Sequence, residues 1–240
     1  MVALSSTRNR GILIVFRPII RPFFKLLSPL WQWLYKRSSS KAQNWQYKGQ
    51  TYHIPIGVFH PKWFFSSQLL VKHLRSLPLK NKPIIEVGSG SGFVAINAAK
   101  QGASVTAIDV NPNAVKATIQ NAKSNNVNLH SIESNLFDNV PPQQFDYIVV
   151  NPPFYPKQAQ NPSEQAWFCG ENFEYFQKLF SQSPQYLSKS GQLIMILSQD
   201  CDTQTILKIA EDYYFIQQSK PIKYDSWLEI NWVFTLICKA

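Results

Sequence analysis

Hydrophobic and polar positions follow two alternating periods from residue 64 onward. Short apolar runs, typical of buried strands, are separated by stretches in which apolar residues recur every three or four positions, as on one helix face. The pattern predicts helices at 64–77, 93–101, 113–125, 172–187 and 203–213, and strands at 83–87, 104–108, 145–150, 192–197 and 227–238. Alternating strands and helices of this length favour an α/β fold with a parallel sheet covered by helices on both faces.

The first 45 residues differ from the remainder, because basic residues and prolines interrupt their apolar positions. Arg17, Arg21 and Lys25 prevent a run of the ~18 apolar residues that a membrane-spanning helix needs. The prolines also fit a secretory signal poorly, and no small-residue cleavage site follows them. We therefore expect a basic, aromatic N-terminal arm at 1–45 and a folded domain at 46–240.

Charge is distributed unevenly along the chain, whose formal net charge is +10. Residues 1–85 contain 14 lysines and arginines and no acidic residue, whereas all 14 acidic residues lie from Glu86 onward. Such a field favours an anionic partner, and the sequence leaves two open for residues 1–40, namely RNA and an anionic membrane surface. The alternative is an arm that packs its aromatic residues against the folded domain or only increases solubility.

Cysteines and histidines give no sign of a metal site. The three cysteines are far apart and form no C-x-x-C or Cys/His cluster, and the four histidines lack the spacing of metal ligands. An odd, scattered set of cysteines is typical of a reducing compartment. We therefore expect no metal and a cytoplasmic location, with peripheral attachment to a membrane as the alternative that the arm leaves open.

A glycine-rich loop follows the predicted strand 83–87. The segment Glu86–Phe93 reads E-V-G-S-G-S-G-F, in which Gly88, Gly90 and Gly92 allow a sharp turn and a close approach to a ligand. The spacing E-x-G-x-G-x-G differs from the dinucleotide pattern G-x-G-x-x-G and lacks the Gly-Lys end of a P-loop. The loop therefore favours a cofactor without phosphates.

Two acidic residues lie where they would border this cofactor. Asp109 ends the predicted strand 104–108, where a carboxylate can accept hydrogen bonds from both hydroxyls of a ribose. The alternative role for Asp109 is a helix N-cap before Asn111 and Pro112. Glu86, beside the loop, is expected either to organise the loop amides or to face a cationic end of the cofactor.

A second motif, Asn151-Pro152-Pro153-Phe154, follows the apolar strand 145–150. Ligands of open α/β sheets bind beyond the carboxyl ends of the strands, so this tetrapeptide is expected to line the ligand crevice. Neither proline has an N–H, so carbonyl acceptors dominate this wall. The Asn151 side-chain oxygen and the Pro152 carbonyl can accept both hydrogens of a substrate –NH2, and Phe154 offers a flat face for stacking. The alternative is a proline-rich turn without chemistry.

Together these stretches resemble the class I methyltransferases that use S-adenosylmethionine (SAM) and carry an N-P-P-Y or N-P-P-F motif. The resemblance runs from about Phe59 to the last residue and is closest to the release-factor glutamine methyltransferases, the HemK family. It implies a Rossmann-like fold with a mostly parallel seven-stranded sheet, a C-terminal antiparallel strand and helices on both faces.

The resemblance also implies which residues bind the cofactor. Gly88, Gly90 and Gly92 would contact the methionine part of SAM, Asp109 its ribose and Asn135 its adenine amino group. The full set of expected cofactor-binding residues is Glu86, Gly88, Gly90, Gly92, Phe93, Asp109 and Asn135. Asn135 replaces the acidic residue usual at its position, although its amide oxygen can accept the same hydrogen bond. Residues 58–67 contain no acid where glutamine methyltransferases have acidic residues, so this segment departs from the family pattern.

The sequence therefore predicts an N-methyltransferase that acts on a planar amide or amino nitrogen of a macromolecule, either a protein glutamine or an RNA base. Asn151, Pro152, Pro153 and Phe154 are the expected catalytic residues. One alternative is a methyltransferase for a small or lipid-linked molecule, held at a membrane surface by the arm. Another is a binding module with this fold and no catalysis, against which the intact Asn151–Phe154 motif argues.

Overall fold

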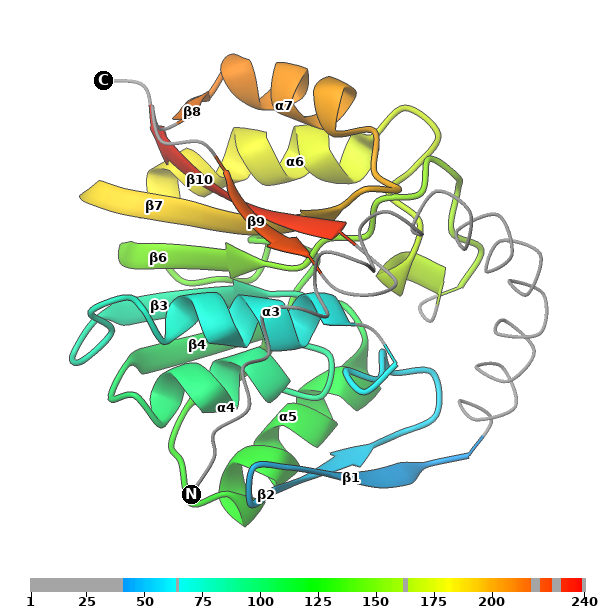
Figure 1. Ribbon diagram of the computed structural model, residues 1–240, viewed down its shortest axis with the longest axis vertical. Coiled ribbons are helices and arrows are strands. Elements are labelled where there is room, and N and C mark those ends of the chain that lie inside the picture. The colour runs from blue at the N-terminus through cyan, green and yellow to red at the C-terminus, as the bar shows by residue number, and fades with distance from the viewer. Residues whose placement is uncertain (1–40, 64, 162–163, 217–220, 226–229, 239–240) are drawn as a thin grey trace, which may run out of the picture. The chain divides into compact units, whose positions relative to one another are not determined.

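The computed structural model describes residues 41–63, 65–161, 164–216, 221–225 and 230–238. Over these residues the chain forms an α/β domain with one eight-stranded sheet and a separate two-stranded hairpin (Figure 1). The α/β class predicted from the hydrophobic pattern is confirmed. The predicted arm lies almost entirely outside the described residues, so its roles stay predictions.

The main sheet has the strand order β5-β4-β3-β6-β7-β10-β8, and β9 also pairs with β10. The strands of the parallel half are β3 (Pro83–Val87), β4 (Ser104–Asp109), β5 (His130–Glu133), β6 (Phe145–Val150) and β7 (Leu187–Ser198). The strands that follow are β8 (Tyr214–Ile216), β9 (Ile222–Asp225) and β10 (Ile230–Cys238), and β10 runs antiparallel to β7, β8 and β9. The mostly parallel sheet with an antiparallel C-terminal strand is therefore confirmed.

The order of the strands creates a switch point between β3 and β6. From β3 the chain moves outward through β4 to β5, then returns to place β6 on the other side of β3 and continues to β7. In open α/β sheets, ligands bind at the carboxyl ends of the strands where the order reverses in this way. The glycine loop follows β3 and the Asn151 motif follows β6, so the topology brings the two motifs to this one point.

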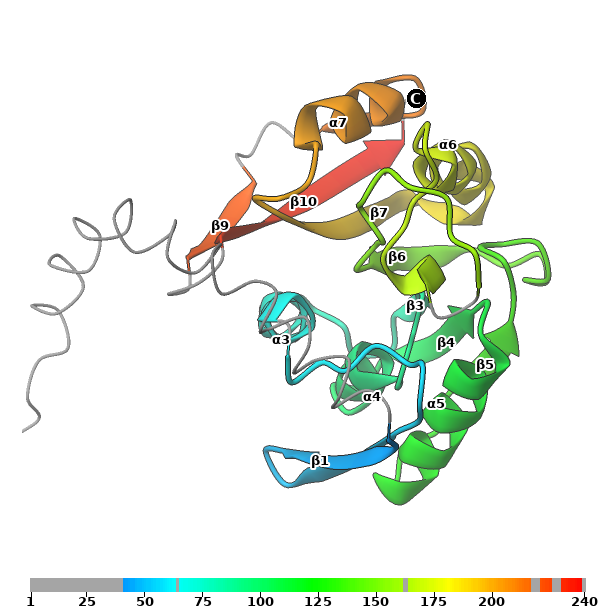
Figure 2. The same cartoon turned by 90° about the vertical axis from the view of Figure 1, so that its right-hand side faces the viewer.

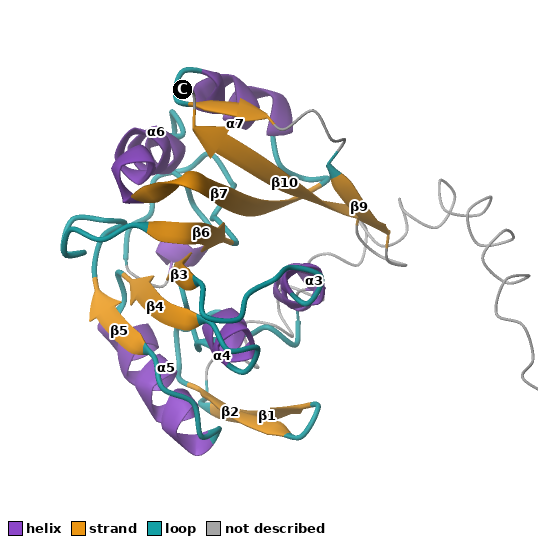
Figure 3. Cartoon of the chain, turned by 90° about the vertical axis from the view of Figure 1, so that its left-hand side faces the viewer, coloured by secondary structure: helices purple, strands orange, loops and turns teal. Residues whose placement is uncertain are grey.

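Helices cover the sheet on both faces, as Figures 2 and 3 show. The described helices are α3 (Phe65–Leu74), α4 (Phe93–Ala99), α5 (Pro112–Ser124), α6 (Glu174–Gln182) and α7 (Thr203–Glu211). The core beneath α3, α4 and α5 includes Ile84, and the core beneath α6 and α7 includes its neighbour Ile85. Both side chains are buried because successive residues of a strand point to opposite faces, and a parallel sheet buries both.

Several predicted elements have different ends in the structure. The predicted helix 172–187 consists of α6 and a 3-10 turn at Ser183–Tyr186, after which β7 begins at Leu187. Pro184 has no N–H and cannot continue the α-helical hydrogen bonds, so the helix changes its winding there. The structure also has the short strands β5, β8 and β9, which the hydrophobic pattern did not predict.

The pattern also did not predict the hairpin of β1 (Gln43–Tyr47) and β2 (Gln50–Ile54). Lys48 and Gly49 form its turn with φ of 48° and 78°, the left-handed pair that a two-residue hairpin turn requires. The rings of Trp45 and Tyr47 lie 5.1 and 5.0 Å from that of Phe93. The hairpin therefore packs on the first residue of α4. It includes residue 45, the predicted domain boundary, and Figure 3 shows it below α4.

Asn121 of α5 and Asn125, the residue just after this helix, complete the free edge of the hairpin. Asn121 accepts a hydrogen bond from the His53 N–H at 2.7 Å and donates to its carbonyl at 2.8 Å. Asn125, one turn later, donates to the Thr51 carbonyl at 2.8 Å and accepts from its N–H at 3.3 Å. Each side-chain amide thus satisfies one donor and one acceptor of β2, as a neighbouring strand would. These bonds attach the hairpin to the helix beside the glycine loop.

Candidate active site

The glycine loop leaves β3 and is held against the end of β4. The N–H groups of Gly88 and Ser89 both donate to the Ile108 carbonyl, at 2.9 and 3.0 Å. Gly88, Gly90 and Gly92 have φ of 75°, 54° and 76°, a region that residues with a Cβ rarely adopt. A Cβ built on Gly88 would meet no atom within 4 Å, so open space adjoins the loop at this point.

Gly92 differs from Gly88 in what surrounds it. A Cβ built on Gly92 would lie 2.9 Å from Thr118 Cγ2, which is closer than real Cβ contacts. The loop therefore needs glycine at this position because α5 packs directly against it. The Thr118 side chain also donates to the Gly90 carbonyl at 3.3 Å. One threonine thus supports two of the three glycines.

Glu86 joins the end of β3 to the first turn of α4. Its Oε2 accepts a hydrogen bond from the Ala95 N–H at 2.7 Å, although Ala95 lies nine residues further along the chain. The first amides of a helix have no partner within the helix, and the preceding residue, Gly92, has no side chain to cap them. Burial of the carboxyl raises the pKa of Glu86 well above its usual range, and the nearby Asp109 adds to this. Glu86 thus binds a backbone amide, that of Ala95 in the first turn of α4.

Phe93 is placed differently from what the resemblance implied. Its ring is buried among the aromatic rings of the hairpin, and the side chain is only 2% exposed. The ring therefore belongs to the core between α4 and the hairpin. Only its backbone, at the start of α4, adjoins the loop.

Asp109 holds the middle of the glycine loop to the end of β4. Its Oδ2 accepts from the Gly90 N–H at 2.8 Å, and its Oδ1 accepts from the Asn111 N–H at 2.9 Å. Burial raises the pKa of Asp109, and these hydrogen bonds oppose the rise. The N-cap of α5 is Asn111, which accepts from the Asn113 N–H at 3.0 Å. The alternative role of Asp109 as the N-cap is therefore wrong, because the N-cap is Asn111 and the helix begins at Pro112.

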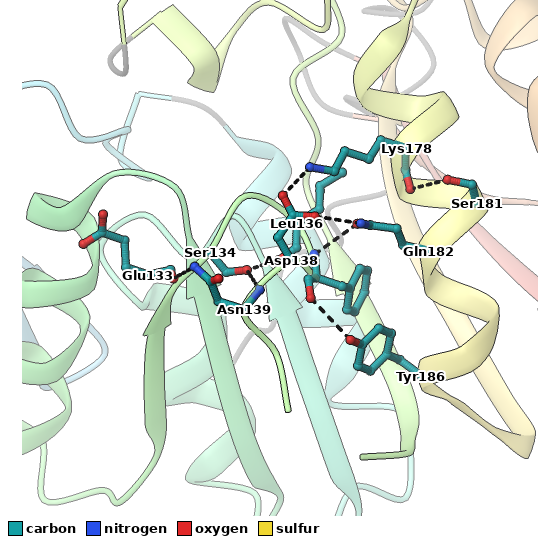
Figure 4. A network of polar contacts seen from close by, with 10 residues as sticks. Glu133, Ser134, Leu136, Asp138, Asn139, Lys178, Ser181, Gln182 and Tyr186 are labelled. Atoms are coloured by element: carbon teal, nitrogen blue, oxygen red, sulfur yellow. Dashed lines mark hydrogen bonds and ion pairs between the residues drawn. The ribbon is translucent and has the colours of Figure 1, made fainter. Parts of the chain in front are cut away.

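Asn135 lies in the loop that follows β5, next to the end of β4. The Ser134 N–H donates to the Asp109 carbonyl at 2.9 Å, which brings this loop to the carboxyl edge of the sheet. The Ser134 hydroxyl donates to the Leu136 carbonyl at 2.6 Å and accepts from the Asn139 N–H at 3.0 Å. Figure 4 shows these bonds closing the turn on itself. Asn135 is exposed.

Helix α6 holds the same loop from the other side. Lys178 forms an ion pair of 2.5 Å with Asp138, and Gln182 donates to the same carboxylate at 2.8 Å (Figure 4). Gln182 also accepts from the Phe137 N–H at 3.2 Å. Tyr186 donates to the Val140 carbonyl at 3.0 Å. Asn135 is therefore presented by a turn whose backbone is fixed at both ends.

Asn151 leaves β6 and turns its amide nitrogen toward α3. Its Nδ2 lies 3.1 Å from the hydroxyl oxygens of both Ser66 and Ser67, in the first turn of that helix. Pro152 and Pro153 are buried, and the Phe154 ring is half-buried beside Tyr155, with the two centroids 4.6 Å apart. The two serines were not among the predicted site residues. No pattern local to the two serines indicates that they contact Asn151, which lies 84 and 85 residues further along the chain.

Aromatic residues connect the segments on either side of the site. The Phe59 ring lies 5.4 Å from that of Trp167, which belongs to the loop after the Asn151 motif. The Phe59 carbonyl lies 3.9 Å from the position of a Cβ on Gly90, so the same residue reaches the glycine loop. Next to it, His60 accepts from the Lys62 N–H at 3.1 Å, and burial lowers the pKa of His60 to about 4. His60 is therefore neutral at physiological pH.

Comparison with known proteins identifies the family. The model of the methyltransferase small domain matches residues 53–221. The chain belongs to the methyltransferase small domain family. Among its relatives is a protein of Methanocaldococcus jannaschii assigned as a protein N5-glutamine methyltransferase, which is 34% identical over 185 residues, covering 72% of this chain and 92% of the relative. The release factor glutamine methyltransferase of Fusobacterium nucleatum is 28% identical over 187 residues, covering 71% of this chain and 52% of that enzyme.

Solved structures of methyltransferases share the fold. The 16S rRNA N2 G1207 methyltransferase of T. thermophilus, in complex with AdoMet (SAM) and guanosine, superposes with a TM-score of 0.61 and 18% identity. The match covers 83% of this chain and 50% of that one. This member of the methyltransferase small domain family is therefore a SAM-dependent methyltransferase with the Rossmann-like fold. The resemblance to the glutamine methyltransferases noted from the motifs is confirmed.

The chain spans nearly all of the M. jannaschii relative but about half of the F. nucleatum enzyme. In the described part of the chain, no helix is long and apolar enough to cross a membrane. Among the same residues, no group of three or more His, Cys, Asp and Glu side chains is arranged to hold a metal ion.

Proposed function

We propose that this enzyme transfers a methyl group from SAM to the side-chain amide nitrogen of a glutamine in a protein. The observation that carries the proposal is the placement of Asn151, whose amide nitrogen faces α3 and whose carbonyl oxygen is then directed away from the serine pair. The motif follows β6, and β6 is hydrogen-bonded to β3, from which the glycine loop emerges. A substrate nitrogen at Asn151 would therefore lie beside the loop proposed to hold the cofactor.

The residues of the motif are suited to an –NH2 group. The Asn151 carbonyl oxygen and the Pro152 carbonyl are acceptors, and neither proline carries an N–H that would compete with the substrate. Two accepted hydrogen bonds would fix both amide hydrogens and orient the nitrogen lone pair toward the methyl group. SAM supplies a methyl group already activated by its sulfonium. The residues would therefore contribute positioning: the N–C bond would form as the S–C bond of the methyl group breaks, S-adenosylhomocysteine would leave, and one amide hydrogen would pass to solvent as a proton.

The cofactor is proposed to lie along the carboxyl edges of β3, β4 and β5. Gly88 and Gly90 would contact its methionine part, since the space next to Gly88 is open and a Cβ on Gly90 would meet only atoms at 3.9 Å. Asp109 would hold the ribose, because each carboxylate oxygen retains a lone pair beyond its bond to a backbone N–H. Asn135 would accept from the adenine amino group. Phe93 would contribute only its backbone, and Glu86 and Gly92 would support the loop.

A glutamine is favoured over an RNA base by two relatives whose names specify glutamine. Residues 58–67 contain no acidic residue, so any contact of this segment with the substrate would be made by side chains other than carboxylates. The predicted cytoplasmic location, and the predicted contact of residues 1–40 with RNA or an anionic membrane, are part of this proposal.

The test is methylation of separated cell fractions with isotope-labelled SAM. The full-length protein is incubated with the protein, RNA and lipid fractions of an extract, and digested protein is analysed for methylated residues by mass spectrometry. We expect label in protein, recovered as a glutamine that carries one additional methyl group on its side-chain nitrogen. Label recovered only in an RNA base would contradict the choice of substrate and retain methyl transfer to a macromolecule. Label recovered only in lipid or small molecules would favour the membrane-attached alternative.

A further inference from the structure

The contact between α3 and the Asn151 motif joins parts of the chain that are distant in sequence. Ser66 and Ser67 lie 85 and 84 residues before Asn151, and both hydroxyl oxygens are 3.1 Å from its Nδ2. Ser67 is buried and Ser66 half-buried. The amide therefore has one serine oxygen for each of its two hydrogens.

The orientation of an asparagine side chain decides what it can bind. The oxygen and the nitrogen of the amide have nearly the same size, but one accepts hydrogen bonds and the other donates them. A substrate –NH2 group needs an acceptor, so the amide must present its oxygen. If the amide rotated by half a turn, its N–H groups would face the substrate nitrogen and compete with its hydrogens.

The serines can enforce the required orientation. Each serine hydroxyl carries two lone pairs but only one hydrogen, so the pair offers more acceptor positions than donors. Two hydroxyl oxygens side by side can accept both hydrogens of the Asn151 –NH2 group. They have fewer hydrogens to donate to the Asn151 carbonyl oxygen if the amide is turned the other way. The pair thus distinguishes the two ends of the amide by hydrogen bonding, which size alone does not do.

We infer that Ser66 and Ser67 are positioning residues that hold the Asn151 carbonyl oxygen toward the substrate nitrogen. This inference rests on the proposed role of Asn151 and extends the site to α3, which the sequence motifs do not include. The serines act through Asn151 and need not contact the substrate or the cofactor.

The first test needs no substrate. In a 15N spectrum of the full-length protein, the side-chain NH2 signal of Asn151 is assigned by its loss in Asn151→Ala. We expect both of its proton signals to shift in Ser66→Ala and Ser67→Ala. The matched control is Ser76→Ala, whose hydroxyl donates to the His73 carbonyl just after the same helix and should leave the signal unchanged. An unchanged Asn151 signal in both serine variants would overturn the inference.

The second test measures the rate of methyl transfer from labelled SAM to the protein fraction of the extract. We expect the Ser66→Ala/Ser67→Ala variant to lose about tenfold or more in kcat, while its affinity for S-adenosylhomocysteine stays the same, because positioning and not cofactor binding is removed. Ser66→Thr keeps a hydroxyl and should retain most of the activity. If the double variant does not fold, the comparison of Ser66→Ala with Ser66→Thr decides, and equal activity of these two contradicts the inference.

Replacement of Asn151 separates orientation from packing. Both oxygens of a carboxylate are acceptors, so the side chain of Asn151→Asp presents an acceptor to the substrate in either orientation. It therefore does not need the serines to fix its orientation. The loss caused by removing the two serines should therefore be much smaller in the Asn151→Asp background than in the wild type. An equal loss in both backgrounds would show that the serines only pack α3 against β6. By contrast, full turnover in Asn151→Ala would contradict the proposed function itself.

Discussion

At the scale of single residues, the buried carboxylate of Glu86 and the half-buried carboxylate of Asp109 accept hydrogen bonds from backbone N–H groups near the loop. Glu86 accepts from the first turn of α4, and Asp109 accepts from the glycine loop and from the residue that caps α5. Burial raises the pKa of both groups. They differ in position, since Glu86 is within the core and Asp109 is at the carboxyl edge of the sheet. This difference leads to separate predictions.

Substitution of Asp109 should affect the cofactor. We expect Asp109→Ala to weaken binding of both SAM and S-adenosylhomocysteine by about 1.5–3 kcal/mol, the usual value of a hydrogen bond to a charged group. Titration calorimetry measures this change, with thermal unfolding as a check because the variant also frees the Gly90 N–H. The control is Asp146→Ala, which removes an acid paired with Lys82 at the amino end of β6, away from the carboxyl edge of the sheet. Unchanged affinity in Asp109→Ala would exclude the ribose contact.

Substitution of Glu86 should change the dependence of stability on pH. Because the pKa of Glu86 is raised in the folded state, folded protein binds more protons than unfolded protein between the usual carboxyl pKa and the raised one. The free energy of unfolding contributed by this group is therefore greatest at low pH and falls as pH rises through that window. Glu86→Gln keeps an acceptor for the Ala95 N–H without the buried charge. We expect its unfolding free energy, relative to wild type, to increase from pH 5 to pH 8 in urea titrations; a parallel pH profile would contradict this.

At the scale of elements, glycines of the same loop have different surroundings, because α5 packs against one end of the loop and open space adjoins the other. At Gly92 a Cβ would collide with Thr118 of α5, whereas at Gly88 it would enter open space. Both residues have positive φ, so a substitution at either one carries a backbone cost of roughly 1 kcal/mol or more. Only Gly92 should add a packing cost.

The comparison of two alanine variants tests this difference. We expect Gly92→Ala to lower the free energy of unfolding by about 2–4 kcal/mol, from strain and overpacking together, and Thr118→Ala in the same chain to recover part of it. Gly88→Ala should be less destabilising, yet it should weaken SAM binding because its methyl group enters the proposed cofactor space. Chemical unfolding and calorimetry measure the two effects. If both variants lost stability equally and bound SAM equally, the proposed division of roles would be wrong.

At the scale of the whole molecule, the uneven charge of the chain remains the strongest indication of a partner. The described residues begin at Lys41, so the role of the basic and aromatic residues at 1–40 stays a prediction from the sequence. We expect a variant without residues 1–40 to retain SAM binding and to lose binding to anionic vesicles, to which each basic residue near the surface contributes about 1 kcal/mol.

The measurement is tryptophan fluorescence of both chains with anionic vesicles and with a folded RNA of matched charge. Insertion of Trp31 and Trp33 at the headgroups would shift the emission of the full chain to the blue with vesicles only. A response to RNA alone would replace the membrane with RNA as the partner. Failure of the shortened chain to fold would show that the arm belongs to the core.

The sequence by itself determined the parts of this protein whose signal is local. The strands β3 and β6 have the bounds that their apolar runs predicted, because a strand buried on both faces must be apolar throughout. The glycine loop and the Asn151 motif were found from residues that are neighbours in the chain. The order of strands and helices then placed both motifs at the carboxyl edge of the sheet.

Only the tertiary structure decided which distant residues complete these motifs. The hairpin was missed because its edge is satisfied by Asn121 and Asn125, which follow β2 by about 70 residues. Ser66 and Ser67 were missed for the same reason, since nothing local to them indicates an asparagine 84 residues away. Hydrogen bonds between side chains of distant segments leave no periodic pattern in the sequence. They form only when the sheet brings the end of β6 beside the start of α3.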